Sequence, residues 1–141
     1  MFGTVSGTFS DTLTSNNAYQ AMTEVLSSGG SQANRFSQLE HRWTMSVGAG
    51  ASKELHVEGF RSSSTDGDDF RFEISTNGGA SFVAVTMSSL PFSDDSIDLV
   101  GTLASGTTGS VIVRVVDTDR TAGHQTFDTV TIDEIWIRAI P

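Results

Sequence analysis

Hydrophobic and polar side chains alternate along much of this chain, and the alternation is clearest between residues 39 and 47. Successive side chains of a β-strand point to opposite faces of its sheet, so a period of two predicts a strand with one buried and one solvated face. The apolar face carries Leu39, His41, Trp43, Met45 and Val47, with a polar residue at every intervening position.

Similar segments recur along the whole chain. The pattern predicts strands over residues 2–9, 19–26, 39–47, 55–61, 70–75, 82–87, 97–103, 111–116 and 129–140. Residues 19–26 also fit one face of a helix, but the segment is short and lies among β patterns, which favours a strand. Asn77-Gly78-Gly79 predicts a hairpin turn, because Asn and Gly tolerate the positive φ of a tight turn.

The alternation changes phase inside the last predicted strand. Ile132 and Ile135 face the same side only if one extra residue is inserted at Asp133-Glu134. A β-bulge inserts one residue in this way, so the sequence predicts a bulge there.

Short strands separated by turn signals, with no helices to carry parallel crossovers, indicate an all-β fold of antiparallel β-sandwich type. We expect eight or nine strands, and a jelly roll fits best, with the first and last strands near each other. No repeat or linker divides the chain, so residues 1–141 are expected to form a single domain. The predicted core comprises Leu39, Trp43, Phe70, Phe72, Ile74, Val113, Val115, Ile132 and Ile135.

Composition narrows the range of functions. The net charge is −9, from 17 acidic and 8 basic residues, and no basic stripe is visible, so we expect no nucleic acid partner. The lack of cysteine excludes disulfides and thiolate metal ligands. The N-terminus has no secretory signal pattern, and no apolar run approaches the roughly 20 residues of a membrane span, so we expect no membrane partner.

No catalytic motif is present. The chain has no Gly-x-Ser-x-Gly elbow and no phosphate-binding loop. Its histidines lack the spacing of a zinc site. We therefore expect a protein that is not an enzyme and has no cofactor, apart from the calcium candidates that follow.

The first calcium candidate lies in the loop after residue 116. Asp117, Asp119 and Asp128 occupy positions one, three and twelve of a twelve-residue window, which partly matches a calcium-binding loop. Ala122 stands where such a loop needs glycine. The structural alternative is that Asp117 and Asp119 cap turns and pair with Arg120.

The second calcium candidate joins Asp133 at the predicted bulge to Asp11 in the first loop. Its alternative is a cross-strand ion pair with an arginine. The acidic loop that contains Asp66, Asp68 and Asp69 is interpreted as solvated rather than chelating.

The two tryptophans are predicted to differ. Trp43 shares the apolar face of its strand and belongs to the core, and His41 on the same face is interpreted as a hydrogen-bonded core histidine. Trp136 falls on the face opposite Ile135, so it is predicted to be exposed. An exposed indole suits either a sugar ligand or a subunit contact.

Several segments together resemble a β-sandwich module of large secreted bacterial and archaeal proteins, which is similar to carbohydrate-binding jelly rolls. The segments are Leu39-Glu40-His41-Arg42-Trp43-Thr44, Asp117-Thr118-Asp119-Arg120-Thr121, Asp128-Thr129-Val130 and Ile132-Asp133. The resemblance implies a jelly roll with a binding or adhesive role, and it names no ligand.

Two functions fit these observations. A small, acidic, cysteine-free sandwich without an export signal suits a decoration (cement) protein of a phage capsid. Such a protein is made in the host cytoplasm, resides in the virion and contacts capsid protein as a homo-oligomer, often a trimer. The alternative is an extracellular carbohydrate-binding module that recognises a polysaccharide. In either case the predicted contact surface comprises Asp117, Asp119, Arg120, Asp128 and Trp136, with Arg120 pairing across a subunit boundary.

Overall fold

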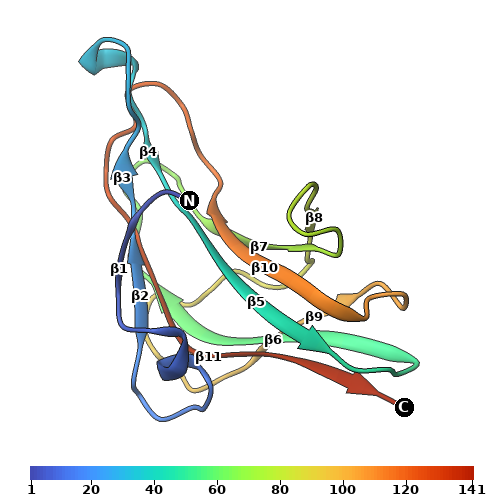
Figure 1. Ribbon diagram of the computed structural model, residues 1–141. Coiled ribbons are helices and arrows are strands. Elements are labelled where there is room, and N and C mark those ends of the chain that lie inside the picture. The colour runs from blue at the N-terminus through green and yellow to red at the C-terminus, as the bar shows by residue number, and fades with distance from the viewer.

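The computed structural model describes all 141 residues as two antiparallel sheets that face each other (Figure 1). The five-stranded sheet has the order β1 (Thr4–Ser6), β2 (Gln20–Thr23), β11 (Thr129–Ile140), β6 (Ser52–Arg61) and β9 (Leu99–Leu103). The four-stranded sheet has the order β5 (Glu40–Val47), β10 (Gly109–Asp117), β7 (Phe70–Ser75) and β8 (Val83–Ala84).

A third, two-stranded sheet pairs β3 (Val25–Leu26) with β4 (Ser37–Gln38) and extends beyond one end of the sandwich (Figure 1). The only helical segments are two 3-10 turns, η1 (Phe9–Thr12) and η2 (Gln32–Asn34). None of the helical segments has the length and apolar character that crossing a membrane requires.

The predicted all-β, antiparallel architecture is confirmed, but the strand count of eight or nine is wrong. Eleven strands form because the segment 19–26 divides into β2 and β3, and because β4 precedes β5. Glu24 lies between β2 and β3, and its backbone N–H donates to the carbonyl of Asp128, which precedes β11.

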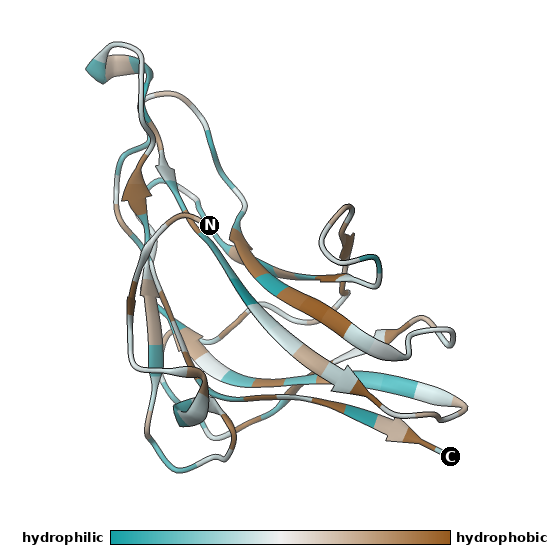
Figure 2. Cartoon of the chain, viewed as in Figure 1, coloured by the Kyte–Doolittle hydropathy of each residue, from teal (hydrophilic) through white to brown (hydrophobic).

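One hydrophobic cluster of 18 buried residues fills the space between the sheets. Every residue of the predicted core belongs to it. Apolar colour runs along much of β10 and β11 in Figure 2, in keeping with their place beside this core.

The predicted bulge is confirmed in β11. Its pairing with β6 shifts register between Ile132 and Glu134, which leaves Asp133 as the extra residue. The Asp133 carboxylate is buried and accepts the backbone N–H groups of Asn16 and Asn17 at 3.3 and 3.2 Å. The bulge keeps Ile135 in the core and directs Trp136 to the outer face.

The N-terminal strand is shorter than predicted. Phe2 bridges to Glu40 of the four-stranded sheet, whereas Thr4–Ser6 pairs with β2 of the other sheet. Gly3 connects the two with a φ of +116°, and a Cβ there would lie 2.5 Å from Cδ1 of Leu39. The chain therefore crosses between the sheets at a residue that only glycine suits.

Candidate functional site

The outer face of the five-stranded sheet carries an exposed aromatic site built on β6 and β11. Trp136 lies opposite His56 in the register of these strands, and their rings stack at 4.1 Å between centroids with 18° between planes. Trp136 is 36 % exposed, which agrees with its predicted position on the outer face. His56 covers one face of the ring, and the exposed part of Trp136 borders a groove that Phe9 and Leu13 also line.

Carboxylates surround this aromatic pair. The two ring nitrogens of His56 lie 3.3 Å from Asp98 and 3.4 Å from Glu54, which fixes the orientation of the imidazole. Farther along the same face, carboxylate oxygens of Glu58, Asp98 and Glu134 lie within 4.8 Å of one another. Burial is the main reason why the pKa of Glu58 is raised.

This arrangement suits recognition of hydroxyl-rich molecules. An aromatic face packs against the C–H groups of a sugar ring, and carboxylates accept hydrogen bonds from its hydroxyl groups. We refer to Trp136, His56, Glu54, Asp98 and Glu134 as the aromatic face site.

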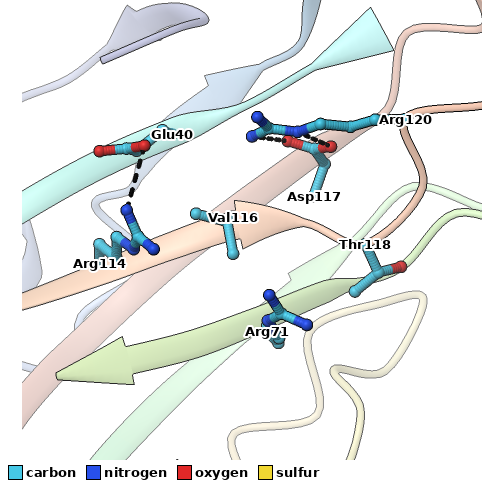
Figure 3. Close-up of a pocket in the computed structure, with 7 residues that line it drawn as sticks. All are labelled: Glu40, Arg71, Arg114, Val116, Asp117, Thr118 and Arg120. Carbon is cyan, nitrogen blue, oxygen red and sulfur yellow. Dashed lines mark hydrogen bonds and ion pairs between the residues drawn. The ribbon is translucent and has the colours of Figure 1, made fainter. Parts of the chain in front are cut away.

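A second candidate is a polar hollow of about 360 Å³ on the outer side of the four-stranded sheet (Figure 3). Its lining consists of Glu40, Arg71, Arg114, Val116, Asp117, Thr118 and Arg120. The side chains come from β5, β7, β10 and the loop after β10, and they point into the same space.

Each arginine of the hollow already has a carboxylate partner in the chain. Arg114 bridges Glu40 and Glu73, which come from the two neighbouring strands. Burial tends to raise the pKa of Glu40, but Arg42 and Arg114 outweigh it and the pKa is lowered. The Arg114 guanidinium also lies 3.8 Å from the centroid of the Phe82 ring. These contacts form a cross-strand charge ladder and leave no unpaired cation for a ligand.

The loop after β10 separates the residues of the first calcium candidate. Arg120 donates to both Asp117 oxygens at 2.9 and 3.0 Å, and Asp117 also accepts the backbone N–H of Leu39 at 2.7 Å. The hydrogen bond to Asp117 is the largest cause that raises the pKa of Arg120. Asp117 and Arg120 thus form the ion pair of the structural alternative, within one chain.

Asp119 makes local contacts instead of joining Arg120. Its carboxylate accepts from the Thr121 backbone and hydroxyl groups and contacts the His124 imidazole. The hydrogen bond from the Thr121 hydroxyl is the first cause that lowers the pKa of Asp119. Asp128 lies elsewhere, in the buried cluster described below.

The second calcium candidate is likewise divided. Asp11 accepts from the backbone and hydroxyl of Thr8 and caps η1. Asp133 is occupied by Asn16 and Asn17, as described for the bulge. The two carboxylates have separate partners and do not share a cluster.

A different set of three carboxylates converges, because Asp128 of the first calcium candidate meets Glu24 and Asp68, a grouping that is not predicted from the sequence. Glu24, Asp68 and Asp128 are 1 %, 5 % and 2 % exposed, and oxygens from all three lie within 4.8 Å of one another. The prediction that the acidic loop is solvated is therefore wrong at Asp68. One signal was available: Glu24 has the same strand parity as the buried Met22, which directs it inward.

The structure also defines the surroundings of His41, which the sequence predicts to be a hydrogen-bonded core residue, and of Lys53. His41 is half-buried and packs edge-on against Trp43 at 4.8 Å, but it has no hydrogen bond, so the expected hydrogen-bonded histidine is not found. Lys53, the only lysine of the chain, is 1 % exposed and donates to the carbonyls of Gly50 and Ser105.

Comparisons with family models and with curated proteins give no match to this chain. Function is accordingly argued from the geometry of these sites.

Proposed function

We propose that this protein is a non-enzymatic glycan-binding module of jelly-roll type that uses the outer face of its five-stranded sheet. The observation that carries the proposal is the exposed Trp136 indole, stacked on His56 and bordered by carboxylates. A rigid sheet holds these groups in place, so little conformational entropy is lost when a ligand binds.

The strand order supports the jelly-roll assignment. Without the edge strand β1 and the small third sheet, the sandwich contains the orders β2-β11-β6-β9 and β5-β10-β7-β8. Two four-stranded antiparallel sheets with chain crossings of this kind are typical of jelly rolls. The first and last strands are also near each other, since β11 pairs with β2 and β2 with β1.

Charge indicates which glycans fit. Glu54, Glu58, Asp98 and Glu134 place negative charge around the indole, and the whole chain carries −9. An anionic polysaccharide would be repelled by this face, whereas a neutral one would offer hydroxyl donors to the carboxylates. We therefore propose a neutral polysaccharide as the ligand and an extracellular site of action.

Binding to a panel of neutral and anionic polysaccharides, by affinity electrophoresis and calorimetry, tests this function. We expect the parent to bind at least one neutral glycan and Trp136→Ala to weaken that binding by about fivefold or more, because a stacked ring contributes on the order of 1 kcal/mol or more. Phe92→Ala, which removes an exposed aromatic from the loop between β8 and β9, is the control and should bind like the parent. Equal binding by Trp136→Ala and the parent, or no neutral glycan bound at all, would refute the proposal.

A specific observation favours capsid decoration as a second candidate. Residues 135–140 of β11 pair only with β6, and beside this unpaired edge lies an apolar groove of about 300 Å³. Phe9 and Leu13 border the groove and are 39 % and 55 % exposed. An unpaired strand edge with apolar neighbours suits a contact with another chain, such as a second copy or a capsid subunit.

The two candidates differ in assembly. A decoration protein should form a homo-oligomer, such as a trimer, and bind to a symmetric particle, whereas a glycan-binding module should bind its ligand as a monomer. Light scattering coupled to size-exclusion chromatography distinguishes these states. Leu13→Asp would disrupt the oligomer of a decoration protein. Trp136 lines the same groove as Leu13, so the oligomeric state of this variant, and not its glycan binding, separates the two candidates.

A further inference from the structure

We infer that Glu24, Asp68 and Asp128 form a buried binding site for a calcium ion, which joins three loops at one end of the sandwich. Calcium binding at these three carboxylates does not depend on glycan binding, because the cluster does not include Trp136 or its neighbours.

The three residues come from distant parts of the chain. Glu24 lies between β2 and β3, Asp68 lies in the loop between β6 and β7, and Asp128 immediately precedes β11. Their carboxylate oxygens nevertheless meet within 4.8 Å. All three side chains are more than nine-tenths buried, so water does not solvate them as it would an acidic patch on the surface.

One oxygen of each carboxylate is held by donors of the chain. Glu24 accepts the backbone N–H of Asp128 at 2.8 Å, and Asp128 accepts the Ser62 hydroxyl at 2.9 Å. One oxygen of Asp68 accepts from the backbone of residues 69, 118 and 119 and from the Thr118 hydroxyl, at 2.8–3.0 Å. Such contacts fix the orientation of metal ligands in known sites.

The other oxygen of each carboxylate has no partner. Oε1 of Glu24, Oδ2 of Asp68 and Oδ2 of Asp128 are buried and accept no hydrogen bond. Native proteins rarely leave buried polar atoms unsatisfied, and three such atoms in one cluster indicate a missing ligand. That ligand must be a donor or a cation, because every unpartnered atom is an acceptor.

The charge of the cluster favours a cation. Three carboxylates lie together, and no lysine, arginine or histidine forms an ion pair with any of them. Buried like charges without compensation are strongly unfavourable. A divalent ion would remove most of this repulsion and fill the coordination of the three unpartnered oxygens.

Ligand chemistry selects calcium among the divalent ions. The cluster offers only oxygen, without the imidazole or thiolate that zinc and copper prefer. Calcium accepts irregular oxygen coordination of six to eight ligands, completed by carbonyls and water, whereas magnesium demands a near-ideal octahedron. A calcium ion at this site would tie the loop of Asp68 to the residue that follows β2 and to the residue that precedes β11.

Calorimetric titration of calcium into protein stripped with EDTA tests the inference directly. We expect one ion per chain, and a melting temperature that rises by about 5–10 °C when calcium is present at roughly a hundredfold excess over its dissociation constant. Magnesium at the same concentration should raise the melting temperature less, because its coordination is more demanding.

Two isosteric substitutions distinguish a calcium site from a cluster of carboxyl groups that binds no metal. Glu24→Gln and Asp128→Asn should lose calcium binding and the calcium-dependent rise in melting temperature. In EDTA at alkaline pH, where all three carboxyl groups are ionised, they should be at least as stable as the parent, because each removes one of the repelling charges. Asp95→Asn, which neutralises an exposed acid outside the cluster, is the matched control and should keep both effects.

Three results would contradict a calcium ion at this site. If the parent binds no calcium by calorimetry and its melting temperature does not respond to calcium, the site is refuted. If stability in EDTA instead falls as pH rises and calcium has no effect, the three carboxylates share a proton and hold no metal. If Asp95→Asn alone abolishes the calcium response, the ion binds elsewhere and the assignment fails.

Discussion

At the scale of the residue, Trp43 joins the two sheets. Its ring is 3 % exposed, stacks near Phe72 at 6.5 Å, and donates its Nε1–H to Gln20 of the opposite sheet at 2.7 Å. The sequence predicted its burial from strand parity, but only the folded chain shows that a glutamine satisfies the indole N–H.

Trp43→Ala should lower the free energy of unfolding by about 3–5 kcal/mol, through lost burial and the cavity that remains. The variant also removes the indole N–H that donates to Gln20. This loss adds to the cost, because the buried amide oxygen of Gln20 is left without a donor. Urea unfolding followed by circular dichroism measures the change. A loss below about 1 kcal/mol would contradict the placement of Trp43 in the core.

Lys53 provides a second test at this scale. Its ammonium group is enclosed and bound to two backbone carbonyls, while Met1 is 78 % exposed. An amine-reactive ester should therefore label only the α-amino group of the folded chain, and should label both amines in denaturant. Peptide mass mapping distinguishes the two patterns, and rapid labelling of Lys53 in the native protein would contradict its burial.

At the scale of the element, the missing side chain of Gly101 lets β9 approach the segment that follows β8. A Cβ at Gly101 would lie 2.3 Å from Cγ1 of Val85, and Val85 is buried and has little room to move. Gly106, in the turn after β9, has open space around its Cα and no positive φ.

Gly101→Ala should destabilise the protein by about 1–3 kcal/mol, because overpacking forces a strand or a side chain to shift. Gly106→Ala introduces the same methyl group without a clash and should change stability by less than about 0.5 kcal/mol. Thermal unfolding of both variants checks the contrast. Equal melting temperatures would show that β9 does not pack closely on Val85.

At the scale of the whole molecule, stability depends on pH through groups with opposite effects. Burial raises the pKa of Glu24 to about 8 and also raises that of Glu58, whereas burial lowers the pKa of His41. A carboxyl group with a raised pKa favours folding at lower pH. A histidine with a lowered pKa favours folding above its unfolded pKa, and this contribution is lost as the pH falls.

A variant isolates the histidine contribution. His41→Phe keeps an aromatic ring beside Trp43 and removes the titration. Between about pH 7.5 and about pH 5, the parent should lose more stability than the variant, because the unfolded histidine takes up a proton that the folded one resists. Urea unfolding at both pH values measures the difference, and identical pH profiles would contradict the cause assigned to His41.

The sequence by itself determined the features that depend on local periodicity. The longer strands, the bulge at Asp133, the burial of Trp43 and the exposure of Trp136 all follow from local pattern, because the direction of each side chain follows from its parity along a strand. The local signal is weaker where strands are short, so the separation of β3 from β2, the strand β4 and the limits of β1 and β8 are not predicted.

Only the tertiary structure decided which distant residues meet. Glu24 and Asp128 are 104 positions apart, and parity alone cannot tell that β11 pairs with β2 and brings them together. The same holds for His56 beside Trp136, which depends on the register of β11 against β6. The pairing of strands is set by the packing of the whole core and by long connections, and the period of a single strand carries no information about either.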